Sequence, residues 1–361
     1  MDFWRKKKNI ITLLKAPKKV VIDFIKNNCD ENPGLPIVEL LIRKKYETFW
    51  IKFGLEHKGS VTKYSREGHT CLSILITRSR IEENYELIEL LLQKGLDPNY
   101  NTRGGFNAFH HLCQQPTLPI KFFRLFFKYG ANPNTPTNNR RKRSPFYYLL
   151  LADHHSLELF KLFHEHKADP IICVHFEFVS CYKVLCTRTR LPEMSVLQFF
   201  NDIGHPIKQN VDGYSTMSLL CSKTLDQEYL DFLLRNGCDI NPKLEHRLIA
   251  RTPLSNSLLH NKIENAKLLL KNGADPNLPS SNSSTPLHCA ISKGVFTLDL
   301  LKLFLKYDTD LNKQTKRGYT LLTFLFVKYY YAFFPEECRY SERLMLNVSG
   351  GIENYERYFK N

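Results

Sequence analysis

The sequence lacks any run of about 18 apolar residues, the length that a helix needs to cross a bilayer. Its richest apolar stretch, residues 321–334, is interrupted by Lys328 and by tyrosines. We also expect no secretion signal, because the apolar stretch at residues 10–14 is too short for a signal-peptide core and is followed by Lys15. We therefore expect a soluble intracellular protein of the cytoplasm, with the nucleus as an alternative, and no contact with membranes.

The short motifs of common enzyme families are absent as well. The sequence has no Gly-x-Gly-x-x-Gly, no P-loop, no Gly-x-Ser-x-Gly and no His-Glu-x-x-His. Its ten cysteines include no Cys-x-x-Cys pair, and this usage is typical of a reducing compartment. We expect neither an enzyme nor a bound cofactor.

Acidic residues are scarce relative to basic ones. The 36 Asp and Glu stand against 51 Lys and Arg, which gives a formal net charge of +15. Such a field favours acidic proteins, nucleic acid or an anionic surface as partner. The charge by itself does not choose among these three.

A recurring tripeptide gives the organisation of the chain. Its third positions are spaced by 35, 37, 36, 34, 36 and 35 residues, and a period in this range is the signature of a stacked repeat array. The seven copies are Asp97-Pro98-Asn99, Asn132-Pro133-Asn134, Asp169-Pro170-Ile171, His205-Pro206-Ile207, Asp239-Ile240-Asn241, Asp275-Pro276-Asn277 and Asp310-Leu311-Asn312.

The clearest repeat, residues 284–312, predicts a short helix, a turn and a longer helix. Thr285 fits the N-cap of the first helix, and Pro286 fits its first turn, where a missing N–H is harmless. The opening Thr-Pro-Leu-His-x-Ala, the Leu-rich second helix and the Asp-x-Asn turn together resemble the ankyrin repeat. This resemblance implies an all-α solenoid of about eight or nine helix-turn-helix units with short hairpin fingers, and it assigns His110 and His288 to structural hydrogen bonds.

The predicted domain organisation follows from the same motifs. Residues 1–34 would form an N-terminal capping region, residues 35–334 the repeat array, and residues 335–361 a C-terminal cap or docking tail. Residues 173–207 form a degenerate unit that we expect to keep its helices and to distort its finger. The clearest units are residues 68–100, 104–134, 143–171, 213–241, 251–277 and 284–312. Glycines at 95, 130, 237 and 273 fit the left-handed position after each second helix.

The ankyrin resemblance implies a non-enzymatic scaffold or adaptor that binds a protein on its concave face of fingers and inner helices. Because the predicted fingers are basic, we expect an acidic protein partner and a monomeric chain. Nucleic acid is the less favoured alternative, since no known nucleic-acid module is recognisable. The candidate binding residues are Tyr100, Arg103, Arg140, Arg141, Lys142, Arg143, Arg247, Lys316 and Arg317.

The C-terminal segment offers a second hypothesis. Its sequence around Phe334, Pro335 and Glu337, with Leu344 further on, resembles the F-box-like tail of many poxvirus ankyrin proteins. That resemblance implies a substrate receptor that recruits a cullin-type ubiquitin ligase, in a viral or other pathogen protein that modulates its host. Phe334 and Cys338 depart from the Leu and Ile of that motif, and a plain capping helix remains the alternative.

A third hypothesis is a metal site. Cys173, His175, Cys181 and Cys186 could supply four zinc ligands, although they lack the close cysteine pair of common zinc folds. We favour buried free thiols and no metal, because small thiols are frequent in protein cores.

Overall fold

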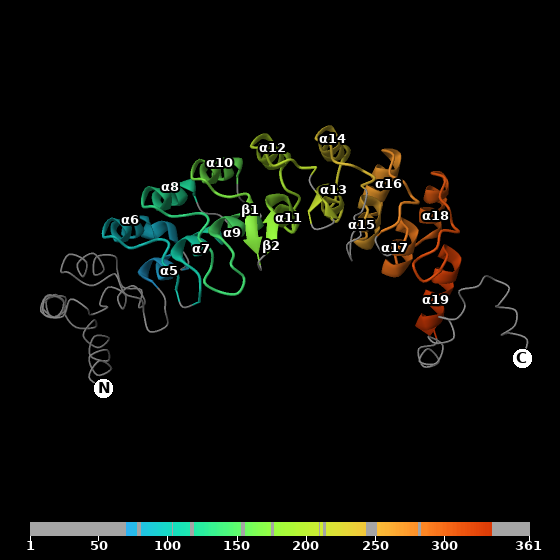
Figure 1. The fold of residues 1–361 in the computed structure, drawn as a ribbon, viewed down its shortest axis with the longest axis horizontal. Helices are drawn as coiled ribbons and strands as arrows, with labels where there is room; N and C mark the ends of the chain where they lie inside the picture. Colours follow the sequence, from blue (N-terminus) through green and yellow to red (C-terminus); the bar gives the residue numbers. More distant parts are fainter. Residues whose placement is uncertain are drawn as a thin grey trace, which may run out of the picture. The chain divides into compact units, whose positions relative to one another are not determined.

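The computed structural model describes residues 70–77, 81–102, 104–115, 119–152, 156–174, 177–208, 210–211, 214–242, 251–280 and 283–333. The chain divides into two compact units, unit 1 (Met1–Cys181) and unit 2 (Tyr182–Asn361). In each unit, short helices alternate along the chain as pairs joined by turns, and extended loops connect one pair to the next (Figure 1). This arrangement confirms the expected all-α fold, to which two short β-hairpins are added.

The described part of unit 1 contains three helix pairs and a hairpin. Its antiparallel hairpin places Ile171 opposite Ser180. The elements are α5 (Cys71–Ile76), the 3-10 helix η1 (Ile81–Asn84), α6 (Tyr85–Gln93), α7 (Ala108–Cys113), α8 (Ile120–Lys128), α9 (Pro145–Leu151), α10 (Leu157–Glu165), β1 (Ile171–Val174) and β2 (Glu177–Ser180).

Unit 2 continues the pattern from α11, whose first residue is the last residue of unit 1. The helices α11 and α12 confirm that the degenerate unit keeps its helix pair. The elements are α11 (Cys181–Cys186), α12 (Met194–Asp202), β3 (Asn210–Val211), β4 (Tyr214–Ser215), α13 (Thr216–Leu220), α14 (Gln227–Arg235), α15 (Pro253–Leu259), α16 (Ile263–Lys271), α17 (Pro286–Lys293), α18 (Leu298–Leu305) and α19 (Leu321–Phe333).

The first helices of successive pairs stack on one another. In unit 1, α7 packs between α5 and α9, and in unit 2, α15 packs between α13 and α17. The core of unit 1 is aromatic: the Phe109 and Phe163 rings stack with centroids 5.6 Å apart, and Phe127 meets Phe163 edge-on at 5.0 Å. Phe163 belongs to α10, so these rings join the second helix of one pair to both helices of the pair before it.

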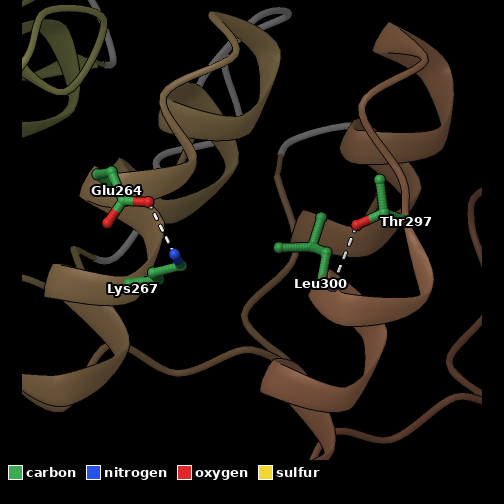
Figure 2. Close-up of polar contacts among 4 residues, drawn as sticks. All are labelled: Glu264, Lys267, Thr297 and Leu300. Atoms are coloured by element: carbon green, nitrogen blue, oxygen red, sulfur yellow. Dashed lines mark hydrogen bonds and ion pairs between the residues drawn. The ribbon is translucent and has the colours of Figure 1, made fainter.

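Helix starts follow the capping chemistry read from the sequence. Ser144 and Thr252 accept hydrogen bonds from backbone N–H groups three residues on, and a proline opens each helix. Thr297 caps α18 in the same way, its Oγ1 accepting from the Leu300 N–H at 3.2 Å (Figure 2). On α16 the exposed Glu264 and Lys267 pair at 2.7 Å, which contributes little to stability but is typical of a solvated helix face (Figure 2).

The turn after each second helix is closed by a left-handed residue. Gly95, Gly130, Gly237 and Gly273 all have φ between 77° and 90°, which confirms the prediction from their spacing. Lys167 and Asp308 take this position at φ 59° and 51° in repeats that have no glycine there.

Asparagines of the recurring tripeptide link neighbouring repeats, and we call each such link an amide rung. Asn277 donates from Nδ2 to the Asp308 carbonyl at 2.9 Å, and its Oδ1 accepts from the Asp310 N–H at 2.7 Å. Equivalent pairs of bonds are made by Asn99, Asn134 and Asn241. At the same tripeptide position, Ile171 and Ile207 have no amide to offer, so the rungs are interrupted on both sides of the degenerate unit.

The predicted repeat boundaries and the number of repeats stay predictions. The capping region at residues 1–34 and the tail at residues 335–361 lie outside the described residues. Within the described ranges, no helix combines the length and the apolar character that a membrane span requires.

Candidate functional site

The loop between α8 and α9 is folded back on itself by its own side chains. We call residues 135–144 the basic finger. Thr137 donates its N–H to the Arg143 carbonyl at 2.8 Å, and Arg143 donates its N–H to Thr137 Oγ1 at 3.0 Å. At the tip, Asn139 Oδ1 accepts from the Arg141 N–H at 2.9 Å, and Lys142 is left-handed with φ 49°. The four consecutive cations are therefore carried by a tight, hydrogen-bonded loop.

The basic finger is also tied to the repeat before it. Asn138 donates its N–H to the Gly105 carbonyl at 2.8 Å. A Cβ at Gly105 would lie 3.0 Å from the Asn138 carbonyl carbon, and its φ of +83° disfavours other residues as well. From α7, the buried His110 uses Nε2 to bond the Arg143 carbonyl at 2.9 Å. Gly105 and His110 thus fix the position of the finger relative to α7.

Aromatic side chains flank the cations of the basic finger. Phe106 stacks on His111 with ring centroids 5.5 Å apart, and the Tyr148 ring lies 5.5 Å from Phe106 at a tilt of 46°. The guanidinium carbon of Arg143 lies 4.6 Å from the centre of the Tyr147 ring, which is within cation–π range. One finger and two first helices, α7 and α9, therefore bring a half-buried aromatic group beside a cluster of cations.

The charge around this cluster is unbalanced. Residues 98–152 contain no Asp or Glu. On α8, Arg124 and Lys128 pair with acids of the neighbouring repeats, Glu158 at 3.3 Å and Glu89 at 3.7 Å. Among the described residues no ion pair involves the finger cations. The eight basic residues of the segment are Arg103, Lys121, Arg124, Lys128, Arg140, Arg141, Lys142 and Arg143.

The pKa values of two titratable side chains in the cluster are shifted by their surroundings. Burial lowers the pKa of His110 to about 4, so its imidazole is neutral near pH 7 and can serve as a structural hydrogen-bonding group. Burial raises the pKa of Tyr148, and the charge of Arg143 together with its side-chain hydrogen bond opposes that rise. Tyr148 therefore remains a phenol at physiological pH.

The structure separates the binding residues predicted from the sequence. Arg140 and Arg141 are exposed, and Lys142 and Arg143 are half-buried in the same loop. Tyr100, in the loop between α6 and α7, is 41% exposed. Lys316 and Arg317 are exposed in unit 2, between α18 and α19. Arg103 and Arg247 lie outside the described residues.

Sequence reasoning missed Phe106, His111, Tyr147 and Tyr148. The acid-free stretch that covers two successive repeats would have drawn attention to them, because all four residues lie within it and both tyrosines come shortly after the basic run.

The candidate zinc ligands give no evidence of a metal site. The thiols of Cys181 and Cys186 are buried. His175 and the side chain of Cys173 lie outside the described part of the chain, within which no group of three His, Cys, Asp or Glu suits a metal ion. The tail residues Phe334, Pro335, Glu337 and Leu344 also lie outside it.

Comparison with known proteins identifies the repeat. Residues 217–315 match the family model described as ankyrin repeats (3 copies). The chain is similar to two ankyrin repeat proteins of fowlpox virus (strain NVSL). FPV024 is 34% identical over 103 residues, which are 28% of this chain and 16% of that protein. FPV031 is 25% identical over 147 residues, 36% of this chain and 41% of that protein. The matched part spans less than half of either relative.

The chain therefore contains ankyrin repeats, and its fold is the expected one. His110 and His288 confirm the structural role that the resemblance implied: His288 Nδ1 meets Thr285 Oγ1 at 2.8 Å, and its Nε2 meets the Tyr319 carbonyl of the next repeat at 3.2 Å. Ankyrin repeats imply a role in protein–protein interaction, and the family is typically non-enzymatic.

Proposed function

Because ankyrin repeats imply a protein-binding role, we propose that this chain is a non-enzymatic scaffold that binds an acidic segment of another protein. The binding surface of the proposal is formed by the basic finger, α7 and α9 in unit 1. One observation carries it: residues 98–152 hold eight cations and no acid, and the finger cations form no ion pair among the described residues.

Electrostatics explain why this surface would prefer an acidic partner. The cations of α8 are partly neutralised by Glu89 and Glu158, so the excess charge is concentrated at the finger. Concentrated charge of one sign steers an oppositely charged partner and repels cationic ones. The half-buried rings of Phe106, His111 and Tyr148 would supply the apolar contact that steering alone does not provide.

The other predicted residues extend the proposal. Tyr100 and Arg103 would enlarge the surface of unit 1, while Arg247, Lys316 and Arg317 would make further contacts in unit 2.

The proposal is tested with displayed peptide libraries. One library of 15-residue peptides is rich in Asp and Glu, and a matched library carries Asn and Gln in their place. Peptides selected on the full chain are then measured against Arg140→Glu/Arg141→Glu. We expect binders from the acidic library, with affinity at least about tenfold weaker for the charge-reversed variant.

A matched control separates this surface from net charge. Lys161→Glu/Lys302→Glu changes the net charge equally at exposed positions on the second helices α10 and α18, and it should bind like the wild type. Equal loss in both variants would contradict the proposal. So would tighter binding of single-stranded U20 RNA than of every selected peptide, because that result would assign the surface to nucleic acid.

A further inference from the structure

Arg143 is held differently from the other three cations of the basic finger. Its backbone makes three hydrogen bonds, to Thr137 N, Thr137 Oγ1 and His110 Nε2. Its guanidinium lies 4.6 Å from the centre of the Tyr147 ring. Arg140 and Arg141 are exposed. The run of four cations therefore contains one arginine with a fixed position.

One donor of this fixed arginine has no acceptor among the described residues. The Arg143 Nε atom is buried and makes no hydrogen bond. Buried donors are almost always paired, so an unpaired one is an exception that needs an explanation. A carboxylate is the planar acceptor that matches the fork of a guanidinium group.

The surroundings of Arg143 suit an acidic side chain more than an isolated ion. Tyr148 adds a phenolic hydroxyl that is protonated at physiological pH, next to the charge of Arg143. The Phe106 ring contacts Tyr148 and stacks on His111, so the three rings form one aromatic cluster. A peptide could therefore place a carboxylate at Arg143 and a neighbouring apolar side chain against these rings.

We propose that Arg143 and Tyr148 form a carboxylate-binding subsite that seats one Asp or Glu of the partner and fixes its register on the finger. Arg140 and Arg141 act differently, by attracting the partner before contact. This inference rests on the proposed function and names the residue that carries specificity within it.

The experiment compares conservative substitutions by binding kinetics, using the peptides selected from the acidic library. Arg143→Lys keeps the charge but removes the planar fork, and we expect about tenfold weaker binding through faster dissociation. Arg141→Lys is the matched control, and we expect less than about a twofold change, because an exposed steering charge is retained. Tyr148→Phe removes only the hydroxyl and should also accelerate dissociation.

A double-mutant cycle identifies the carboxylate. Each acidic residue of the peptide is replaced in turn by its amide, and one replacement should weaken binding to the wild type about tenfold while leaving binding to Arg143→Lys unchanged. If every replacement weakens both proteins equally, the subsite does not exist.

The outcomes also separate this inference from the proposed function. Loss of binding in Arg140→Glu/Arg141→Glu with unchanged kinetics in Arg143→Lys and Tyr148→Phe would overturn the subsite and keep the basic surface. If Arg143→Lys lowers the thermal midpoint, its weaker binding could come from lost stability. The kinetics of Tyr148→Phe then test the subsite alone, since a phenylalanine retains the ring contacts.

Discussion

Burial favours the neutral form of a histidine, and His110 illustrates this at the scale of a single residue. Its Nδ1 accepts from the Asn107 backbone N–H at 3.2 Å, and its Nε2 donates to the Arg143 carbonyl at 2.9 Å. The first contact belongs to the cap of α7, and the second reaches the next finger. One side chain therefore joins a helix start to the basic finger, and protonation of Nδ1 would remove its bond to the helix start.

The first prediction concerns pH. Burial holds the pKa of His110 near 4 in the folded chain, against a usual value of 6.5. Between these values the unfolded chain binds more protons on this imidazole, so the free energy of unfolding rises with pH. Lowering the pH from 7.5 to 5 should cost about 2 kcal/mol through His110 alone, and urea unfolding at the two pH values measures it.

The control for this prediction is His110→Gln, in which position 110 no longer titrates. The variant is less stable at pH 7.5, but its loss on acidification should be about 2 kcal/mol smaller than that of the wild type. His288 is present in both proteins, and burial lowers its pKa as well, so its contribution cancels. An equal loss in both proteins would show that His110 isn't the group responsible.

At the scale of the element, the amide rungs couple neighbouring repeats through hydrogen bonds between their turns. Each rung asparagine sits at a turn closed by an aspartate or asparagine two residues earlier: for example, Asp275 Oδ1 accepts from the Asn277 N–H at 2.7 Å. The Asp275 bond thus fixes the backbone of the turn and holds Asn277 where its side-chain amide can bond the next repeat. Because both residues are needed for the link, the whole tripeptide recurs and not the asparagine alone.

The second prediction compares two asparagines of this kind. Asn277→Ala removes the bonds to Asp308 and Asp310 and should lower the free energy of unfolding by about 1–2 kcal/mol. Asn312→Ala is the matched control. Asn312 follows Asp310 in the same turn, but its amide bonds no other repeat among the described residues, so we expect a change below about 0.5 kcal/mol. Comparable losses in urea melts of the two variants would show that the rung bonds do not stabilise the array.

Elements that meet a local requirement could be predicted from the sequence. Gly237 and Gly273 follow from the need for a left-handed turn, and Thr285 with Pro286 follows from the chemistry of a helix start. Each requirement recurs with the period of the array, so the clearest repeats show where the same residues are needed in the others.

The candidate site could be predicted only in part, because it depends on contacts between repeats. The run from Arg140 to Arg143 is visible as charge, but its division into one fixed and two exposed arginines is not. That division requires Tyr147 beneath the guanidinium and Phe106, from the preceding repeat, beside Tyr148. In the same way, the pairing of Arg124 with Glu158 joins residues that are 34 positions apart.

At the scale of the whole molecule, stability is distributed over two compact units. In an array, each repeat is stabilised by contacts with the neighbouring repeats. A substitution therefore destabilises only those repeats that are coupled to it through such contacts. The amide rungs are present at Asn99 and Asn134 in unit 1 and at Asn241 and Asn277 in unit 2. Since they are interrupted at Ile171 and Ile207, we infer that the two units lose structure at separate denaturant concentrations.

Buried thiols can report this separation residue by residue. Seven cysteines are buried in the described part of the chain: Cys71, Cys113, Cys181, Cys186, Cys221, Cys238 and Cys289. Burial raises the pKa of Cys186 and of Cys238 to about 12, and it raises that of Cys113 as well. Because the thiolate is the reactive form, such thiols react with alkylating reagents only when the surrounding structure opens.

The third prediction is that Asn277→Ala shifts the labelling midpoints of Cys221, Cys238 and Cys289 to lower urea and leaves those of Cys71 and Cys113 unchanged. The first three thiols share unit 2 with Asn277, whereas the last two lie in unit 1. Brief iodoacetamide pulses at increasing urea, followed by mass spectrometry of each cysteine peptide, give the five midpoints. A common shift of all five would mean that the array unfolds as one cooperative body, in which case the interrupted rungs do not limit coupling.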